Sequence, residues 1–153
     1  MSTPTELELK CRPACSADLA RIVAIEADAF PDPYPYLVLR QLFDVHSSTW
    51  LVVEAEGLVI GYALMLENDG EAMLFTFAVH SDYRGHGYGS ALLRDALTDQ
   101  EKAGSKRVWL TVRPDNEEAI RRFARAGFRP SGYEEEYFGP NEPRFVYEYL
   151  IDR

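Results

Sequence analysis

The chain has 153 residues, of which 46% are hydrophobic, and its formal net charge at pH 7 is -9. This composition suits a single folded domain with a hydrophobic core and excludes a disordered chain. No stretch approaches the ~20 apolar residues of a membrane helix, and no signal-peptide pattern opens the chain, so we expect a cytoplasmic protein. The acidic charge argues against nucleic-acid binding; it would attract an amine, although acidic surfaces also serve solubility.

Regular elements alternate along the first third of the chain. Residues 6–11 alternate in polarity and predict a strand. Ser16 is a candidate N-cap for the helix that follows. The apolar residues of this helix recur at helical spacing: Leu19, Ile22, Val23 and Ile25. Three prolines within residues 31–35 end the helix, and a second helical segment comes after them.

The rest of the chain continues this alternation. Residues 50–65 predict a β-hairpin, and residues 72–79 form an apolar strand. A long helix begins near Gly87 and ends before Gly104, and residues 145–150 predict a closing strand. No linker or repeat interrupts the pattern, so we predict one α+β domain with a mixed sheet.

The glycine-rich turn at residues 83–93 is the most informative segment. It lies between an apolar strand and a helix, where backbone N–H groups and the positive end of the helix dipole converge on one point. Gly85, Gly87 and Gly89 permit positive φ angles and close approach of a ligand, and Arg84 adds a positive charge. The sequence therefore predicts a site for a phosphorylated ligand, with a plain tight turn as the alternative.

The spacing of these glycines excludes two common nucleotide sites. A Walker loop needs a lysine directly after its last glycine, and none follows here. A dinucleotide fingerprint needs Gly-x-Gly-x-x-Gly and an acidic residue about 20 positions further on, where this chain has Trp109.

The Arg-x-x-Gly-x-Gly pattern at residues 84–89 resembles the acyl-CoA pyrophosphate loop of the GCN5-related N-acetyltransferase (GNAT) family. Residues 72–79, 108–116 and 116–128 are similar to the family's central strand, its next strand with the following asparagine, and the helix that closes with Gly-Phe. The resemblance is close over residues 70–130, and within the family it is closest to the bacterial ribosomal-protein N-terminal acetyltransferases and their archaeal relatives. It implies a single α+β domain over residues 1–153. Its central mixed, mostly antiparallel sheet of six to seven strands is splayed at the cofactor site and flanked by about four helices.

The resemblance also implies an activity: transfer of an acetyl group from acetyl-CoA to a primary amine by direct attack in a ternary complex. Backbone groups on residues 77–79 would bind the pantetheine arm and stabilise the oxyanion. The cofactor-binding residues implied in this way are Phe77, Ala78, Val79, Arg84, Gly85, His86, Gly87, Tyr88, Gly89, Ser90, Asn116 and Phe123. A helix cap is the alternative role for Asn116, and core packing is the alternative for Phe123.

The chain departs from its relatives at both proton-transfer positions. Thr111 stands where the ribosomal-protein group has a glutamate base, and Phe123 stands where it has a tyrosine acid. Neither side chain can transfer a proton near pH 7. An α-amine or another amine of low pKa could still react by positioning alone, so we expect a protein N-terminus or a small amine as acceptor. The alternative is a catalytically impaired acyl-CoA-binding module.

Substitute groups at the acceptor side come from elsewhere in the chain. Tyr137 resembles the first residue of a tyrosine pair that lines the relatives' acceptor site, and it could protonate the leaving thiolate; a strand aromatic is the alternative. Glu26, Tyr34 and Tyr36 occupy the region where relatives hold the acceptor. For Glu26 the alternative is a solvated helix residue.

The sequence does not predict a metal site. Cys11 and Cys15 are too few for a disulfide framework, and the three histidines lack the spacing of metal ligands. We therefore expect reduced thiols and no metal. We also expect a monomer or homodimer.

Overall fold

The computed structural model describes residues 10–151, which form two compact units. The first unit contains residues 10–66 and 75–96, and the second contains the remainder. The strand predicted at residues 6–11 begins at Lys10 within this range, and residues 6–9 lie outside the described residues. Three elements of secondary structure have residues in both units. We therefore propose, as the sequence predicts, that residues 1–153 form a single domain.

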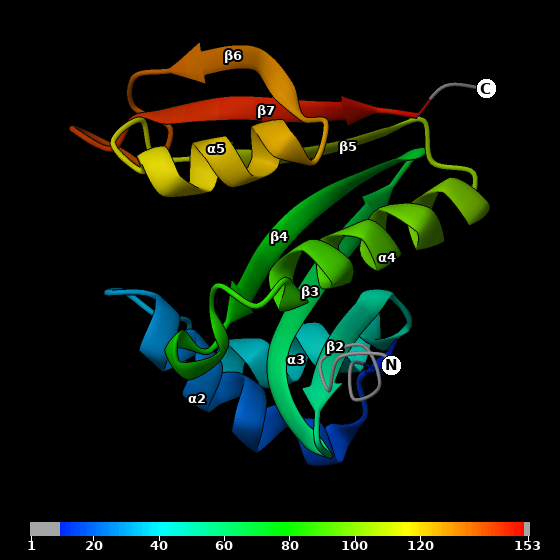
Figure 1. Cartoon of the computed structure of the whole chain (residues 1–153). Helices are drawn as coiled ribbons and strands as arrows, with labels where there is room; N and C mark the ends of the chain where they lie inside the picture. Colours follow the sequence, from blue (N-terminus) through cyan, green and yellow to red (C-terminus); the bar gives the residue numbers. More distant parts are fainter. Residues whose placement is uncertain (1–9, 152–153) are drawn as a thin grey trace. The chain divides into compact units, whose positions relative to one another are not determined.

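Seven strands form one sheet in the order β1-β2-β3-β4-β5-β7-β6. The strands are β1 (Lys10–Pro13), β2 (Trp50–Ala55), β3 (Leu58–Asn68), β4 (Glu71–Val79), β5 (Arg107–Val112), β6 (Arg129–Glu134) and β7 (Arg144–Leu150). The pairs β1–β2, β2–β3, β5–β7 and β6–β7 are antiparallel, and the pair β4–β5 is parallel. The described residues include four α-helices: α2 (Leu19–Ala29), α3 (Tyr36–His46), α4 (Tyr88–Lys102) and α5 (Glu117–Arg125). The predicted α+β fold with a mixed, mostly antiparallel sheet is confirmed (Figure 1).

Helices α2 and α3 pack against β2 and β3 to form the core of the first unit. The spacing predicted for α2 is confirmed, since Leu19, Ile22 and Ile25 are all buried. They share this core with the large side chains of Trp50 and Tyr62. This packing places the C-terminal end of α2 beside β3 and β4, where the side chains of the candidate site lie.

The hairpin predicted at residues 50–65 is present as β2 and β3. Its two turn residues, Glu56 and Gly57, have φ angles of 55° and 80°. Two successive positive φ angles give a turn whose twist matches that of the flanking strands, and glycine adopts this conformation at little cost.

The prediction that Ser16 caps the first long helix is wrong. Ser16 begins a short 3-10 turn, and the N-cap of α2 is Asp18. The Asp18 carboxylate is buried and accepts hydrogen bonds from the backbone N–H of Cys15 at 2.8 Å and from Arg12 Nη1 and Nη2 at 2.8 and 2.9 Å. A buried charge needs such partners, so Asp18 ties β1 to the start of α2.

We expect Asp18→Asn to lower the free energy of unfolding by about 2 kcal/mol at pH 7, the usual value for hydrogen bonds to a charged group. The Arg12 side chain is the main cause that lowers the pKa of Asp18 in the folded protein. A lowered folded pKa stabilises the protein above the unfolded pKa of about 3.9, and this contribution is lost as pH falls further. The wild-type advantage should therefore shrink below about pH 4 in urea titrations.

A matched control is Asp44→Asn. Asp44 pairs with Arg40 on the exposed face of α3, where an ion pair contributes little. If both substitutions have the same effect at pH 7, the Asp18 contacts do not stabilise the fold.

The second unit contains β5, β6 and β7 together with α5 (Figure 1). The ring of Phe128, just after α5, lies 5.6 Å from the rings of both Phe123 and Tyr149. All six residues of β6 are exposed, so the strand has no alternation of buried and exposed positions, and its sequence did not indicate it. Its pairing with β7 defines it instead.

Candidate functional site

The glycine-rich turn connects β4 to α4 within the first unit, as the sequence predicts. Gly85 and Gly87 have φ angles of 82° and 85°, and a Cβ atom at either position would find nothing within 4 Å. Helix α4 begins at Tyr88, and its first hydrogen bond runs from the N–H of Ala91 to the Gly87 carbonyl at 3.1 Å. The open backbone and the helix N-terminus fit a diphosphate group.

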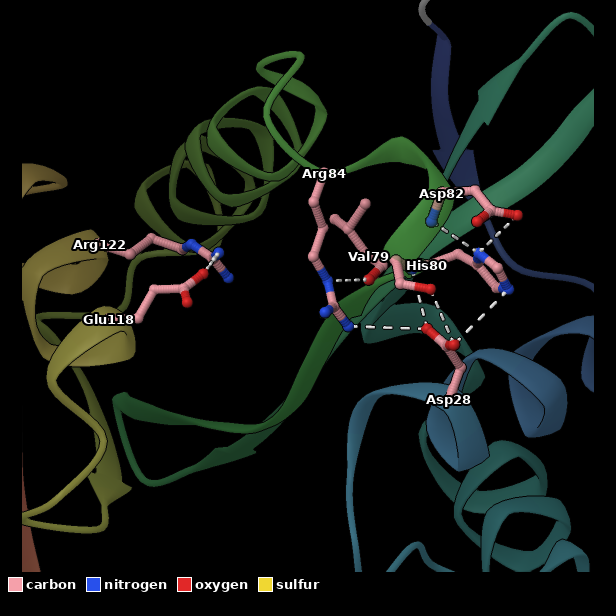
Figure 2. A network of polar contacts seen from close by, with 8 residues as sticks. Asp28, Val79, His80, Asp82, Arg84, Glu118 and Arg122 are labelled. Carbon is pink, nitrogen blue, oxygen red and sulfur yellow. Dashed lines mark hydrogen bonds and ion pairs between the residues drawn. The ribbon is translucent and has the colours of Figure 1, made fainter.

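Arg84 is anchored at the start of this turn. Its Nε donates to the Val79 carbonyl oxygen at 3.0 Å, and its Nη2 lies 3.6 Å from Asp28 Oδ2. Asp28, on α2, also accepts hydrogen bonds from the Ser81 backbone N–H and hydroxyl, both at 2.9 Å. Figure 2 shows the Asp28 carboxylate between the side chains of Arg84 and His80. Through Asp28, α2 therefore helps to hold the turn.

The contacts of Asp28 keep it a carboxylate. The Ser81 backbone N–H and hydroxyl are the main causes that lower the pKa of Asp28, and the positive charge of Arg84 acts in the same direction. His80 Nδ1 accepts from the N–H of Asp82 at 3.1 Å, so in a neutral imidazole the proton is assigned to Nε2, which faces Asp28 at 3.9 Å. Sequence reasoning missed Asp28, because nothing in the pattern of α2 distinguishes it from a solvated residue.

The other cofactor-binding residues predicted near the turn belong to the same unit. Phe77, Ala78 and Val79 are buried at the end of β4. Tyr88 is also buried, and its ring stacks with that of the exposed His86 at 6.1 Å. The two remaining positions are Gly89, which is half-buried, and Ser90, which is exposed.

Glu26 lies inside the first unit, so its interpretation as a solvated helix residue is wrong. The residue is only 1% exposed. Its Oε1 accepts hydrogen bonds from the hydroxyls of Tyr62 and Thr76, the latter at 3.1 Å, and its Oε2 accepts from the backbone N–H of Tyr34 at 3.0 Å. Burial and the neighbouring carboxylate raise the pKa of Tyr62, which therefore remains a phenol that donates. The available signal was two hydroxyl-bearing residues, Tyr62 and Thr76, within apolar strands.

The two tyrosines predicted at the acceptor side follow α2. The ring of Tyr34 stacks on that of Phe75 in β4, with the ring centroids 5.1 Å apart. Tyr34 is 37% exposed and Tyr36 is 49% exposed. The structure thus brings together Glu26 and Tyr34, and Tyr36 lies two residues further on, at the start of α3.

The second unit contains the remaining predicted residues. Thr111 is half-buried on β5, opposite Val146 of β7. Asn116 is the N-cap of α5, with its Oδ1 accepting from the Ala119 N–H at 3.2 Å, so the capping role considered for it is present. Phe123 is buried against Phe128, as its packing alternative predicts. Cofactor contacts of Asn116 and Phe123 stay predictions.

Tyr137 lies in a turn after β6 and not on a strand, which corrects the alternative considered for it. The residue is half-buried, and its ring meets that of Phe138 edge-on at 4.7 Å. Its role as the acid that protonates the leaving thiolate stays a prediction.

Across residues 10–151, no three or more His, Cys, Asp and Glu side chains gather closely enough to hold a metal ion. Within the same part of the chain, no helix has the length and apolar character needed to cross a bilayer.

Comparisons of the chain with a protein-family model, with curated proteins and with solved structures agree with one another. The model of the acetyltransferase (GNAT) family matches residues 19–128. An N-alpha-acetyltransferase of Sulfurisphaera tokodaii is 26% identical over 91% of both chains. Crystal structures of Ard1 from Thermoplasma volcanium and of the ribosomal-protein-S18-alanine N-acetyltransferase from Escherichia coli share the fold. The Ard1 structure has a TM-score of 0.89 and 23% identity, and the alignment covers 95% of this chain and 99% of that chain. The Escherichia coli structure has a TM-score of 0.83 and 24% identity, and the alignment covers 95% of both chains.

Proposed function

Because the chain belongs to the acetyltransferase (GNAT) family, whose acyl donor is acetyl-CoA, we propose that it acetylates the α-amino group at the N-terminus of a protein. It is an N-acetyltransferase, and the proposal concerns its acceptor, its mechanism and the residues that carry them. The relative from Sulfurisphaera tokodaii, similar over 91% of its length, is an N-alpha-acetyltransferase and supports this acceptor class.

The observation that carries the proposal is that Thr111 and Phe123, which cannot transfer a proton, occupy the two positions of the general base and the general acid in the ribosomal-protein group. An α-amine with a pKa near 7.7–8.0 is already about one-tenth neutral at pH 7. A lysine with a pKa near 10.4 is neutral at roughly one part in two thousand. The α-amine can therefore attack without a strong base, whereas a lysine would need one.

The proposed chemistry is a single transfer between two bound substrates. The neutral amine nitrogen attacks the thioester carbonyl carbon, the C–S bond breaks, and the coenzyme leaves as a thiolate that is protonated. The ammonium formed on the nitrogen loses its proton to solvent. Main-chain groups of residues 77–79 would hold the thioester, and the turn at residues 84–89 would hold the diphosphate.

The direct test is incubation with acetyl-CoA and a panel of peptides with free or blocked N-termini and with or without lysine, alongside small amines. We expect release of free thiol only with free N-termini, and mass spectrometry should place the acetyl group on the first residue. Acetylation confined to lysine or to small amines would overturn the proposed acceptor. Coenzyme binding without thiol release from any acceptor would favour the impaired binding module.

We expect Tyr137→Phe to lower kcat about tenfold and to leave the acetyl-CoA KM nearly unchanged. General acids contribute 10²–10⁴-fold in other enzymes, but a thiolate is a good leaving group and needs less help. Steady-state kinetics with the best peptide measures both constants. Tyr133→Phe is the control, because Tyr133 is an exposed tyrosine on the neighbouring strand β6. An unaltered rate in Tyr137→Phe would remove this residue from the mechanism.

A further inference from the structure

The buried carboxylate of Glu26 joins four separate parts of the first unit. It lies on α2 and accepts hydrogen bonds from β3 through Tyr62, from β4 through Thr76, and from the segment after α2 through the backbone of Tyr34. At 1% exposure its side chain is closed to solvent, so it cannot itself grip an acceptor ammonium. Its influence on a substrate must pass through the groups that it holds.

Of these groups, Tyr34 reaches the surface. Its N–H is fixed by Glu26 Oε2, and its ring lies on Phe75, two residues before the stretch of β4 on which we propose that the thioester binds. The residues that follow also expose large hydrophobic side chains: Tyr36 at 49%, Leu37 at 72% and Val38 at 38%. An exposed tyrosine ring stacked on β4, followed along the chain by exposed hydrophobic side chains, suits contact with the first side chains of an acceptor peptide.

We propose that Glu26 is a positioning residue for the acceptor, which acts by fixing the backbone of Tyr34 and thereby the ring that contacts the bound peptide. This inference rests on the proposed function. The segment at residues 31–35 contains three prolines, so few of its backbone groups can donate hydrogen bonds. The bond from the Tyr34 N–H to Glu26 is therefore an effective way to anchor it to the core.

The test is a double-mutant cycle with Glu26→Ala and Tyr34→Ala, using whichever amine the wild-type protein acetylates. Glu26→Ala should raise the acceptor KM about tenfold or more and leave the calorimetric affinity for coenzyme A within twofold of wild type. In the Tyr34→Ala background, Glu26→Ala should raise the acceptor KM little further, because the group through which it acts is gone.

Thr76→Val is the matched control. It removes another buried hydrogen bond of the same carboxylate and leaves the Tyr34 N–H contact in place. It should lower thermal stability without changing the acceptor KM. An equal rise in acceptor KM for Thr76→Val and Glu26→Ala would mean that Glu26 has only a structural role, and independent effects of Glu26→Ala and Tyr34→Ala would also overturn the proposal.

Glu26→Gln covers the case in which Glu26→Ala does not fold. One amide oxygen then replaces two carboxylate oxygens, so the acceptor KM should rise about threefold, and the same cycle with Tyr34→Ala applies. The cycle uses whichever amine the wild-type protein acetylates in the panel of peptides and small amines. If that amine is not an α-amine, the proposed function fails, but the role of Glu26 can still be tested. An unchanged acceptor KM would end the role of Glu26 and leave the proposed function standing.

Discussion

Replacement of Gly87 by valine should weaken the binding of coenzyme A about 100-fold, which corresponds to about 2.7 kcal/mol. Gly87 has a φ angle of 85°, where a β-branched residue costs about 1–3 kcal/mol. If the variant keeps this backbone conformation, the valine side chain lies over the backbone N–H groups of the turn. If the backbone changes its conformation, those N–H groups no longer point at the diphosphate. Isothermal titration calorimetry with coenzyme A measures the loss.

The control for backbone strain is Gly57→Val. Gly57 has a φ angle of 80°, and a Cβ atom there, as at Gly87, would meet nothing within 4 Å, but the residue lies in the turn between β2 and β3. It should lose similar stability and keep full affinity for coenzyme A. A folded Gly87→Val protein with unchanged affinity would count against the assignment of the turn as the diphosphate site.

Local patterns in the sequence predicted the parts of the fold that depend on neighbours along the chain. The positions of Leu19, Ile22 and Ile25 predicted the buried face of α2, and the apolar runs within residues 50–65 predicted the hairpin. Strand β6 was missed because all its residues are exposed, and its pairing with β7 depends on a segment ten residues further along the chain. The N-cap was placed at Ser16 because the sequence does not reveal that Arg12 binds Asp18.

The same distinction holds for the candidate site. The strand, the turn and the helix around Gly87 are contiguous, so their spacing predicted the arrangement. The hydrogen-bond partners of Glu26 are Tyr34, Tyr62 and Thr76, which follow it in the sequence by 8, 36 and 50 positions. Only the folded chain brings the Tyr34 N–H and the two hydroxyls to its carboxylate. A charge on a helix was therefore read as solvated when strands β3 and β4 in fact cover it.

Replacement of Gly127 by alanine should lower the free energy of unfolding by about 3 kcal/mol. Gly127 follows α5 with a φ angle of 106°, and hydrogen bonds from its own N–H to the Ala124 carbonyl and from Phe128 N–H to the Phe123 carbonyl close the helix end. A Cβ atom would lie 3.0 Å from the ring of Tyr149. The left-handed conformation costs about 1 kcal/mol for alanine, and the clash adds about 2 kcal/mol.

Gly104→Ala separates these two costs, because Gly104 ends α4 in the same way. Its φ angle is 90°, its N–H bonds to the Glu101 carbonyl, and the next N–H bonds to Gln100, but a Cβ atom there would meet nothing within 4 Å. Urea titrations should therefore show a loss of only about 1 kcal/mol for Gly104→Ala. Equal losses at Gly104 and Gly127 would mean that the Tyr149 ring moves aside. The Gly-Phe closure of α5 would then reflect the conformation of the backbone alone, and not its packing on β7.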